Sequence, residues 1–171
     1  MLYISPSLET PLGNIFLAAE DDKLVGLWFE GQKYFCEAIR GSHAQICDDL
    51  SIFIHIQDWL RRYFAGEAPS ADELEIALMG SEFRREIWRL LSGIPYGQTV
   101  TYGHLAAQYA KEKQLTRFSA QAVGGAVAHN PISIIIPCHR VLGQGGSLTG
   151  YAGGIERKKR LLDLEGASYK E

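Results

Sequence analysis

The 171-residue sequence predicts an α+β protein of two domains: a small N-terminal antiparallel sheet with helices (residues 1–79), then a mainly helical, winged-helix-like C-terminal domain with a helix-turn-helix (residues 80–171). Short apolar segments separated by turn residues fill the first third of the chain, which is typical of antiparallel strands. Apolar residues then recur at helical spacing, which predicts helices for most of the remainder.

The N-terminal domain is expected to consist of a small sheet closed by one long helix. Three strands are predicted, at residues 2–4, 14–19 and 24–29. Turn-forming residues separate them, so the strands should pair antiparallel. Apolar residues at helical spacing run from Leu50 to Phe64. Gly66 ends this pattern, and the stretch from Gly66 to Gly80 is predicted to be the linker to the next domain.

The C-terminal domain is expected to contain three short helices. Ser81 and Thr101 carry side-chain oxygens that can accept hydrogen bonds from the first N–H groups of the first two helices. The third helix is expected to begin near Ser119. Asn130-Pro131 ends the third helix. A helix, a short loop and a slender second helix follow one another from Thr101, which is the order of a helix-turn-helix.

The segment Ile132–Val141 is an apolar run that ends in Pro-Cys-His-Arg. Its β-branched residues predict a strand, which should hold Cys138 rigidly in or beside the core. A thiol reacts as a thiolate, and an adjoining imidazole and arginine favour that form. Cys138 is therefore the leading candidate for a nucleophile. A buried, inert cysteine beside a surface histidine is the alternative.

The composition argues against several classes of protein. No apolar run approaches the ~20 residues that span a bilayer, and the N-terminus lacks the features of a signal peptide, so a cytoplasmic protein is expected. The three cysteines have no CxxC spacing, which argues against a disulfide framework and against an evident zinc site. Cys36, His43 and Cys47 could share a metal ion, but no fourth ligand is in view.

The net charge of −3 hides a difference between the two domains. Residues 1–79 hold five Lys and Arg against thirteen Asp and Glu, whereas residues 80–171 hold twelve against seven. The basic part suits a polyanion, because Lys and Arg beside phosphates release counterions. Uneven charge that serves only solubility is the alternative.

The predicted helix at residues 120–129 is made largely of Ala, Val and Gly. Each glycine inside a helix costs about 1 kcal/mol relative to alanine, so something requires the absence of side chains. Close packing against another helix and close approach to a nucleic-acid groove are both open. In the second case Ala122 and Gly124 contact DNA, while Gln121 and Tyr102 lie where a base could be pushed out of the duplex.

Three stretches together carry a family resemblance. IPCHRV (136–141), preceded by AVGGAVAHNPISI (122–134) and followed by TGYAGGIERKKRLLDLEG (149–166), resembles the O6-alkylguanine-DNA alkyltransferases, also called methylated-DNA–protein-cysteine methyltransferases. The match is dense over residues 81–171, whereas in the N-terminal domain only length and strand pattern agree.

The resemblance implies DNA repair by direct reversal. The alkyl group, methyl in the simplest case, would pass irreversibly from O6-alkylguanine in double-stranded DNA, after base flipping, to the protein's own cysteine. O4-alkylthymine is a further candidate substrate. Each molecule would react once, as a suicide methyltransferase. A monomer suffices for this chemistry, and neither a metal nor another cofactor is required.

Five residues are implied to be catalytic. Cys138 resembles the alkyl acceptor, His139 the base that takes the thiol proton through a bound water, and Glu165 the carboxylate that orients the imidazole. Asn130 resembles the residue that ties the turn to the active site through hydrogen bonds. Tyr102 resembles the residue that rotates a backbone phosphate and supplies a proton to the departing guanine.

The position of Glu165 in the sequence also suggests a role, independently of the family resemblance. It lies in the last turn of the helix predicted after Gly154, where a negative charge opposes the helix dipole. A partner such as His139 would explain that position, and chance placement in solvent is the alternative.

Other residues are implied to bind the base or the DNA. Val141 and Cys138 would offer backbone carbonyls to the guanine amino group. Tyr151, with the backbone of Ala152 and Gly153, would wall the pocket and donate to O6. Arg140 would brace the strand or interact with DNA.

One position departs from the family. Gln121 stands where many members carry an arginine that fills the space left by the flipped base. Glutamine has no charge and cannot stack as a guanidinium does, so lesion capture should be weaker, unless Arg117 one turn earlier assists.

Two other functions compete with alkyl transfer. A cysteine hydrolase could use Cys138 and His139, although neighbours on an extended segment point to opposite faces unless the turn bends sharply. A non-catalytic winged-helix protein could bind the lesion without repairing it. Sensors similar to this family lack the acceptor cysteine, which this chain has.

Overall fold

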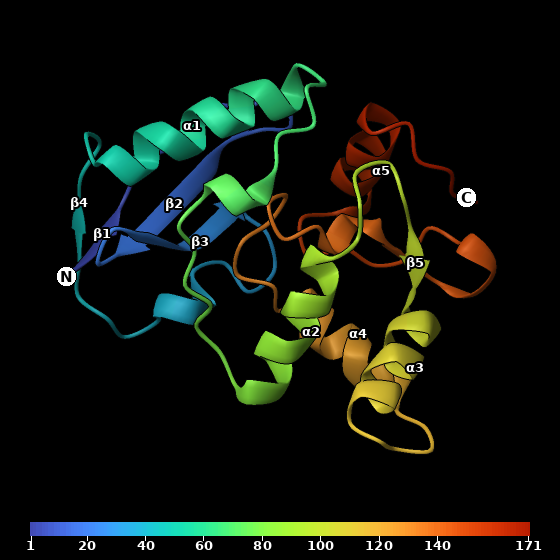
Figure 1. Ribbon diagram of the computed structural model, residues 1–171. Coiled ribbons are helices and arrows are strands. Elements are labelled where there is room, and N and C mark those ends of the chain that lie inside the picture. The colour runs from blue at the N-terminus through green and yellow to red at the C-terminus, as the bar shows by residue number, and fades with distance from the viewer. The chain divides into compact units, whose positions relative to one another are not determined.

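The computed structural model describes residues 1–171, which fold into two compact units (Figure 1). The first unit is Met1–Gly80 together with Pro131–Ser133, and the second is Ser81–Asn130 together with Ile134–Glu171. A sheet with a helix in one unit and a helical cluster in the other confirm the predicted α+β class. None of the helices is both long and apolar enough to cross a membrane.

The sheet of the first unit contains the predicted strands and one more. β1 (Leu2–Ile4), β2 (Ile15–Glu20) and β3 (Lys23–Phe29) pair antiparallel, as predicted. β4 (Ala44–Ile46) was missed, and it pairs with β1 in parallel to give the order β3-β2-β1-β4. The prediction of a purely antiparallel sheet is therefore wrong at this edge. All residues of β4 are exposed, so no apolar alternation marks the strand.

The predicted long helix is α1 (Ser51–Phe64), which lies across the sheet (Figure 1). Its apolar residues bury one face at helical spacing: Ile52, Phe53, Ile56, Trp59, Leu60 and Tyr63. A 3-10 turn, Glu37–Ile39, adds Ile39 to a second cluster around the fully buried Trp28. Gly26 makes room for that ring, because a Cβ there would lie 1.8 Å from it.

The free edge of β3 is covered by two short segments. In the first, Leu24 donates to Glu75 O at 2.8 Å and accepts from Ala77 N at 2.9 Å. In the second, Leu27 donates to Pro131 O at 2.9 Å and accepts from Ser133 N at 3.0 Å. The predicted linker therefore contributes to the sheet, and it also contains a 3-10 turn. Covering an edge strand in this way removes a site of unwanted pairing.

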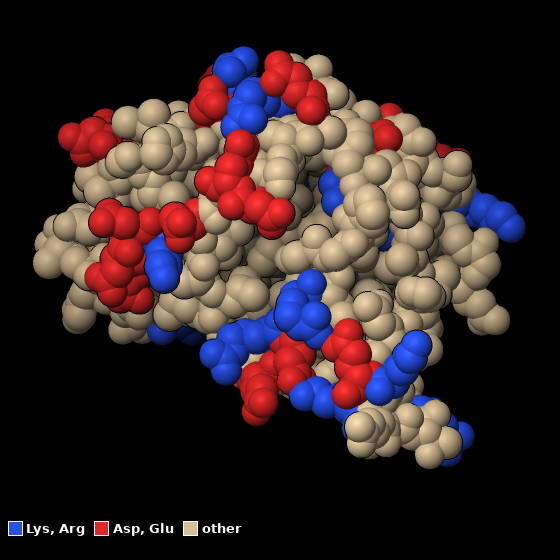
Figure 2. Space-filling view, in the orientation of Figure 1, with Lys and Arg blue, Asp and Glu red and all other residues tan.

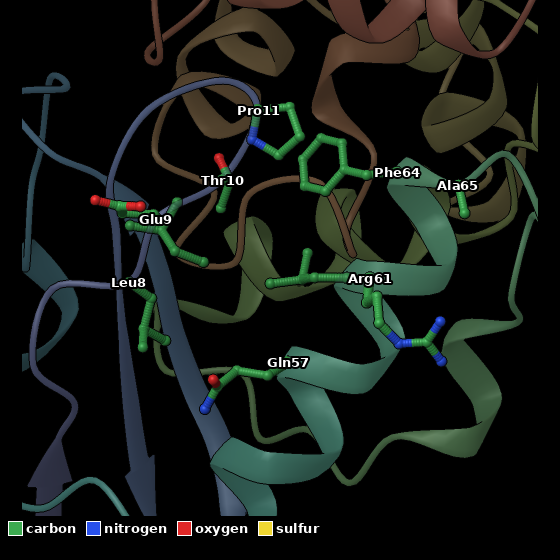
Figure 3. Close-up of a pocket in the computed structure, with 10 residues that line it drawn as sticks. Leu8, Glu9, Thr10, Pro11, Gln57, Arg61, Phe64 and Ala65 are labelled. Carbon is green, nitrogen blue, oxygen red and sulfur yellow. The ribbon is translucent and has the colours of Figure 1, made fainter.

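A hollow of about 530 Å³ lies between α1 and the loop before β2 (Figure 3). Pro11 and Phe64 line it from the two sides, and none of the predicted site residues belongs to it. Over the strands and helix of this unit most of the charged groups in view are acidic, whereas around α2 and α3 basic and acidic groups lie side by side (Figure 2).

The second unit contains the three predicted helices, a short two-stranded sheet and a C-terminal helix. The elements are α2 (Glu82–Ser92), β5 (Val100–Thr101), α3 (Tyr102–Glu112), α4 (Ala120–Ala128), β6 (Val141–Leu142) and α5 (Ile155–Leu164), with 3-10 turns at Cys138–Arg140 and Gln144–Gly146. β5 and β6 pair in parallel. The predicted caps are confirmed: Ser81 and Thr101 each accept a backbone N–H, at 3.3 and 3.0 Å. Ser119, near which the third helix was expected to begin, caps it in the same way at 3.1 Å.

The helices α2, α3 and α4 pack around a common core. Trp88 of α2 is buried and donates from Nε1 to Ala126 O at 2.8 Å, which ties α2 to the C-terminal half of α4. Ile87, Leu105 and Val123 supply buried apolar side chains from the three helices. This arrangement fixes the C-terminal end of α4, from which the chain runs toward Cys138.

The predicted strand before Cys138 is not formed. Only Ile132 makes a bridge, with Leu27, and the following residues turn. Ile134 has φ +70°, a left-handed conformation that interrupts an extended chain. The apolar residues are all buried, so the pattern indicated burial and not strand geometry, which a short apolar run cannot distinguish.

The close fit of Gly26 to Trp28 generates a prediction about stability. Gly26→Ala should lower the free energy of unfolding by about 1–3 kcal/mol, because the added methyl group must displace a buried ring. Urea unfolding followed by tryptophan fluorescence measures the change. Gly103→Ala is the control, since its methyl would meet only Thr101 Oγ1 at 3.8 Å. Equal stability of the two variants would contradict the assigned packing.

Candidate active site

Cys138 lies at the start of a 3-10 turn and is only 5% exposed. Burial raises the pKa of its thiol, while a hydrogen bond from Asn130 and the positive charge of Lys158 oppose that rise. Its own backbone N–H and that of His139 act in the same direction as Asn130. The site therefore combines a buried thiol with several groups that favour its anion.

Asn130 joins the end of α4 to the turn that carries the thiol. Its Nδ2 donates to Ile136 O at 2.8 Å, and its side chain also hydrogen-bonds Cys138. Asn130 is buried, at the second position after the last residue of α4. One amide thus holds both the backbone before Cys138 and its sulfur.

His139 pairs with Glu165 inside the protein. His139 Nε2 lies 2.7 Å from Glu165 Oε1, and both side chains are 0% exposed. Burial lowers the pKa of His139, although Glu165 acts to raise it, so the imidazole is neutral at neutral pH. Because the hydrogen bond to a carboxylate places the proton on Nε2, Nδ1 is the basic atom. No protein group bonds to Nδ1.

Glu165 connects three parts of the second unit. It follows the last residue of α5, and its carboxylate accepts from Arg140 Nε at 2.8 Å, from Arg140 Nη2 at 2.9 Å and from Gly97 N at 3.2 Å. Burial acts to raise the pKa of Glu165, but the hydrogen bonds from His139 and Arg140 outweigh it and hold the pKa well below its usual range. These partners explain a negative charge at a helix C-terminus.

Arg140 is buried beside the same carboxylate. Besides its two bonds to Glu165, its Nη1 donates to Ile94 O at 2.6 Å, and its guanidinium lies 5.7 Å from the ring of Tyr96. The sequence left bracing and DNA contact open for Arg140. Each of its three side-chain nitrogens donates to a group within the protein, which favours bracing.

Gly97, on the loop after α2, was missed as a site residue. A Cβ on Gly97 would lie 2.9 Å from Glu165 O, and its φ of +77° favours glycine. The tight approach lets its N–H reach the carboxylate of Glu165. Lys158 was also missed, because a lysine within a run of basic residues looks like a surface residue.

Tyr102 begins α3 and is partly buried near both α4 and the thiol. Burial raises the pKa of its phenol, and the negative charge that Cys138 acquires as a thiolate raises it further. A hydrogen bond with Thr149 acts in the opposite direction. The phenol therefore keeps its proton at neutral pH, as a proton donor must.

The glycines of α4 are not required by packing within the protein. A Cβ on Gly124 would make ordinary contacts of 3.7 and 3.8 Å with the Tyr102 ring, and a Cβ on Gly125 would meet nothing within 4 Å. Gln121, Ala122 and Gly125 are exposed. The sequence left two explanations for the missing side chains of α4. Close packing against another helix does not account for Gly125, so close approach of an external partner is the explanation that is left.

The residues predicted to form the base pocket lie on β6 and on the loop before α5. Val141 is buried in β6, and its carbonyl accepts from Lys158 Nζ at 2.6 Å. Tyr151 and Ala152 are half-buried, and Gly153 is buried and accepts from Arg157 Nη1 at 2.9 Å.

Nowhere in the chain do three or more His, Cys, Asp or Glu side chains gather in a group able to hold a metal ion.

Comparison with known proteins identifies the family. Residues 3–78 match the model described as "6-O-methylguanine DNA methyltransferase, ribonuclease-like domain", and residues 82–167 match the model described as "6-O-methylguanine DNA methyltransferase, DNA binding domain". The chain therefore belongs to the 6-O-methylguanine DNA methyltransferase family.

Individual relatives agree with this assignment. The methylated-DNA–protein-cysteine methyltransferase of Mycolicibacterium paratuberculosis is 42% identical over 93% of this chain and 90% of its own length. The protein of the same name from Salmonella typhimurium is 50% identical over 65% of this chain and 62% of its own length. A crystal structure of Mycobacterium tuberculosis OGT in complex with DNA is similar with a TM-score of 0.82 and 38% identity, over 96% of this chain and 92% of that one.

The contacts of Glu165 predict a large loss of stability when its charge is removed. Glu165→Gln should lower the free energy of unfolding by about 3–5 kcal/mol, because Arg140 is left buried without its charged partner. Urea unfolding at neutral pH measures this. Glu156→Gln changes an exposed acid of the same helix and should stay within about 0.5 kcal/mol of the parent protein. A mild effect of Glu165→Gln would mean that the pair is not a closed, buried one.

Proposed function

We propose that this protein repairs alkylated DNA by moving the alkyl group of O6-alkylguanine to Cys138, with each molecule reacting once. The observation that carries the proposal is the buried pair His139–Glu165 next to a buried cysteine. A neutral imidazole with a basic Nδ1 can take the proton of the thiol, and the carboxylate then stabilises the imidazolium that forms.

The reaction we propose is a direct displacement at the alkyl carbon. The thiol proton of Cys138 passes through one water molecule to His139 Nδ1, and the thiolate attacks the alkyl carbon in line with the C–O6 bond. A C–S bond forms as the C–O6 bond breaks, and its electron pair leaves with the guanine. Tyr102 donates its phenolic proton to the departing base. The atoms and electrons of this displacement balance without a metal or a redox cofactor.

The product explains why each molecule reacts once. Alkylated Cys138 is a thioether, which is inert to the general bases around it. Because no second step regenerates the thiol, the site has no need to admit a water nucleophile. The burial of Cys138 is consistent with chemistry of this kind.

The DNA substrate must present its base outside the helix stack, since O6 of guanine lies within the duplex. We propose that α4 approaches double-stranded DNA through Ala122, Gly124 and the exposed face that includes Gly125. A helix without long side chains reads few base edges, so binding should depend little on sequence. Gln121 would enter the space of the flipped base, and the exposed Arg117 just before α4 would supply the charge that Gln121 lacks.

For the flipped guanine we propose the pocket bordered by Val141, Tyr151, Ala152 and Gly153. The carbonyls of Cys138 and Val141 would accept from the guanine amino group. Val141 O already accepts from Lys158, but a carbonyl oxygen has two lone pairs and can accept a second bond. We further infer that a monomer acts, because one thiol and one base complete the reaction.

A cysteine hydrolase is not favoured. The sequence objection to it, that Cys138 and His139 would point apart on an extended segment, no longer holds, since the two lie on a 3-10 turn. Family membership argues against it instead. A lesion-binding protein without chemistry is also not favoured, because its site would need neither the thiol nor the buried His139–Glu165 pair.

Intact-protein mass spectrometry tests the proposed chemistry. After incubation with duplex DNA that contains one O6-methylguanine, the protein should gain the mass of one methyl group, and Cys138→Ser should gain none. Cys47→Ser is the matched control, because this cysteine lies in the other unit beside Asp49, and it should react like the parent protein. A methyl group on any other residue, or repaired DNA with unmodified Cys138, would refute the proposal.

The open position of Gly125 predicts opposite effects on folding and on DNA binding. Gly125→Ala should raise the free energy of unfolding by about 1 kcal/mol, because alanine favours the helix. It should weaken binding to duplex DNA about tenfold, or about 1.4 kcal/mol, because the methyl group holds the backbone away from the groove. Fluorescence anisotropy measures binding, and Gln57→Ala on α1 serves as control. Unchanged affinity would place the DNA elsewhere.

A further inference from the structure

α5 carries a buried cation that the reaction described above does not use. Lys158 is 0% exposed, although a charged ammonium group is costly to remove from water. Its Nζ donates to three backbone carbonyls: Val141 at 2.6 Å, Thr149 at 2.7 Å and Gly150 at 3.1 Å. An ammonium group has three N–H donors, so all of them are satisfied.

The three carbonyls belong to two segments that border the candidate site. Val141 directly follows the turn that carries Cys138, and Thr149-Gly150 directly precedes Tyr151. Lys158 therefore links α5 to both walls of the pocket proposed for guanine. An apolar side chain in its place would leave three carbonyls without this donor.

The charge of Lys158 is not offset by a carboxylate. Burial lowers its pKa to about 8, and the group that acts to raise that pKa is the thiolate of Cys138. The influence is mutual: burial raises the pKa of Cys138, and the charge of Lys158 opposes the rise. Burial and this same charge both lower the pKa of His139. The ammonium also lies 6.0 Å from the ring centre of Tyr102.

The charges around Cys138 balance only when the thiol ionises. Glu165 and Arg140 neutralise each other, and His139 is neutral. Lys158 therefore leaves one positive charge in a buried site. A thiolate at Cys138 cancels it, and an opposite charge at close range favours an ionised form by about 1–3 pKa units.

We propose that Lys158 is a positioning residue for alkyl transfer, which holds the two walls of the base pocket together and acts as the counter-cation of the Cys138 thiolate. This rests on the function proposed above. Lys158 touches neither the alkyl carbon nor the guanine in this scheme. It raises the population of thiolate that can react, and the thiol proton still goes to His139.

Lys158→Met tests the charge, and Lys159→Met on the neighbouring surface position is the matched control. The thiol pKa of Cys138 is measured from thiolate ultraviolet absorbance, after subtracting the same titration of the corresponding Cys138→Ser protein. In Lys158→Met this pKa should rise by about 1 or more. The single-turnover rate constant of methyl transfer at saturating DNA should fall at least about tenfold, while affinity for undamaged duplex DNA should stay within about twofold. Lys159→Met should match the parent protein in all three.

Lys158→Arg and pH dependence supply the second test. The parent rate should fall as pH rises through about 8, because Lys158 then loses its proton. Arginine stays charged, so Lys158→Arg should keep much of the rate and lack this fall. Cys138, His139 and Tyr102 are the other titratable groups that face Lys158. None of them would produce a fall near pH 8. Ionisation of Cys138 acts to increase the rate. The pKa of His139 is lowered, so it has already lost its proton, and the pKa of Tyr102 is raised, so it still keeps its proton.

The outcomes are distinguishable. A folded Lys158→Met protein with an unchanged thiol pKa would overturn the role of Lys158, and so would a parent rate that shows no fall near pH 8. If Lys158→Met does not fold, Lys158→Arg and the parent pH profile decide. If the parent protein takes no methyl group from DNA, the proposed function fails, whereas the thiol titration still decides the role of Lys158.

Discussion

The buried carboxylate of Glu165 is the group on which the turn that carries Cys138 depends. It accepts from His139 and Arg140 on the turn and from Gly97 on the loop after α2, and so joins two segments to the end of α5. Buried ion pairs add little net stability, because desolvation offsets attraction, but they tolerate only one geometry. The turn at Cys138 is therefore held by directed charge and hydrogen bonds, where a strand had been expected.

This constraint also sets the electrostatics of the thiol. Arg140 satisfies Glu165, so the carboxylate orients His139 and leaves the site without a surplus negative charge. Lys158 remains as the one unbalanced cation near Cys138, satisfied by carbonyl groups only. The arrangement opposes the effect of burial on the thiol, which by itself disfavours the anion.

The two glycines of helix α4 lower the stability of the helix, and no packing contact within the fold requires them. The positions of Gly124 and Gly125 would accept a methyl group without a clash, and alanine would favour the helix. A protein that must bring backbone close to a bulky partner has a reason to keep these positions bare. Ser119 caps the N-terminal end of this helix, and Asn130, just beyond its C-terminal end, bonds the backbone before Cys138.

The sequence by itself determined the elements whose signals are local. Strands at β1, β2 and β3, the caps Ser81 and Thr101, and the choice of Cys138 as candidate nucleophile follow from periodicity, cap chemistry and residue type within a few positions. Only the tertiary structure decided the parallel strand β4, the left-handed Ile134, and the burial of Arg140 and Lys158. These depend on groups far away in the chain, such as Glu165 for Arg140 and the carbonyl of Val141 for Lys158, and no local pattern records them.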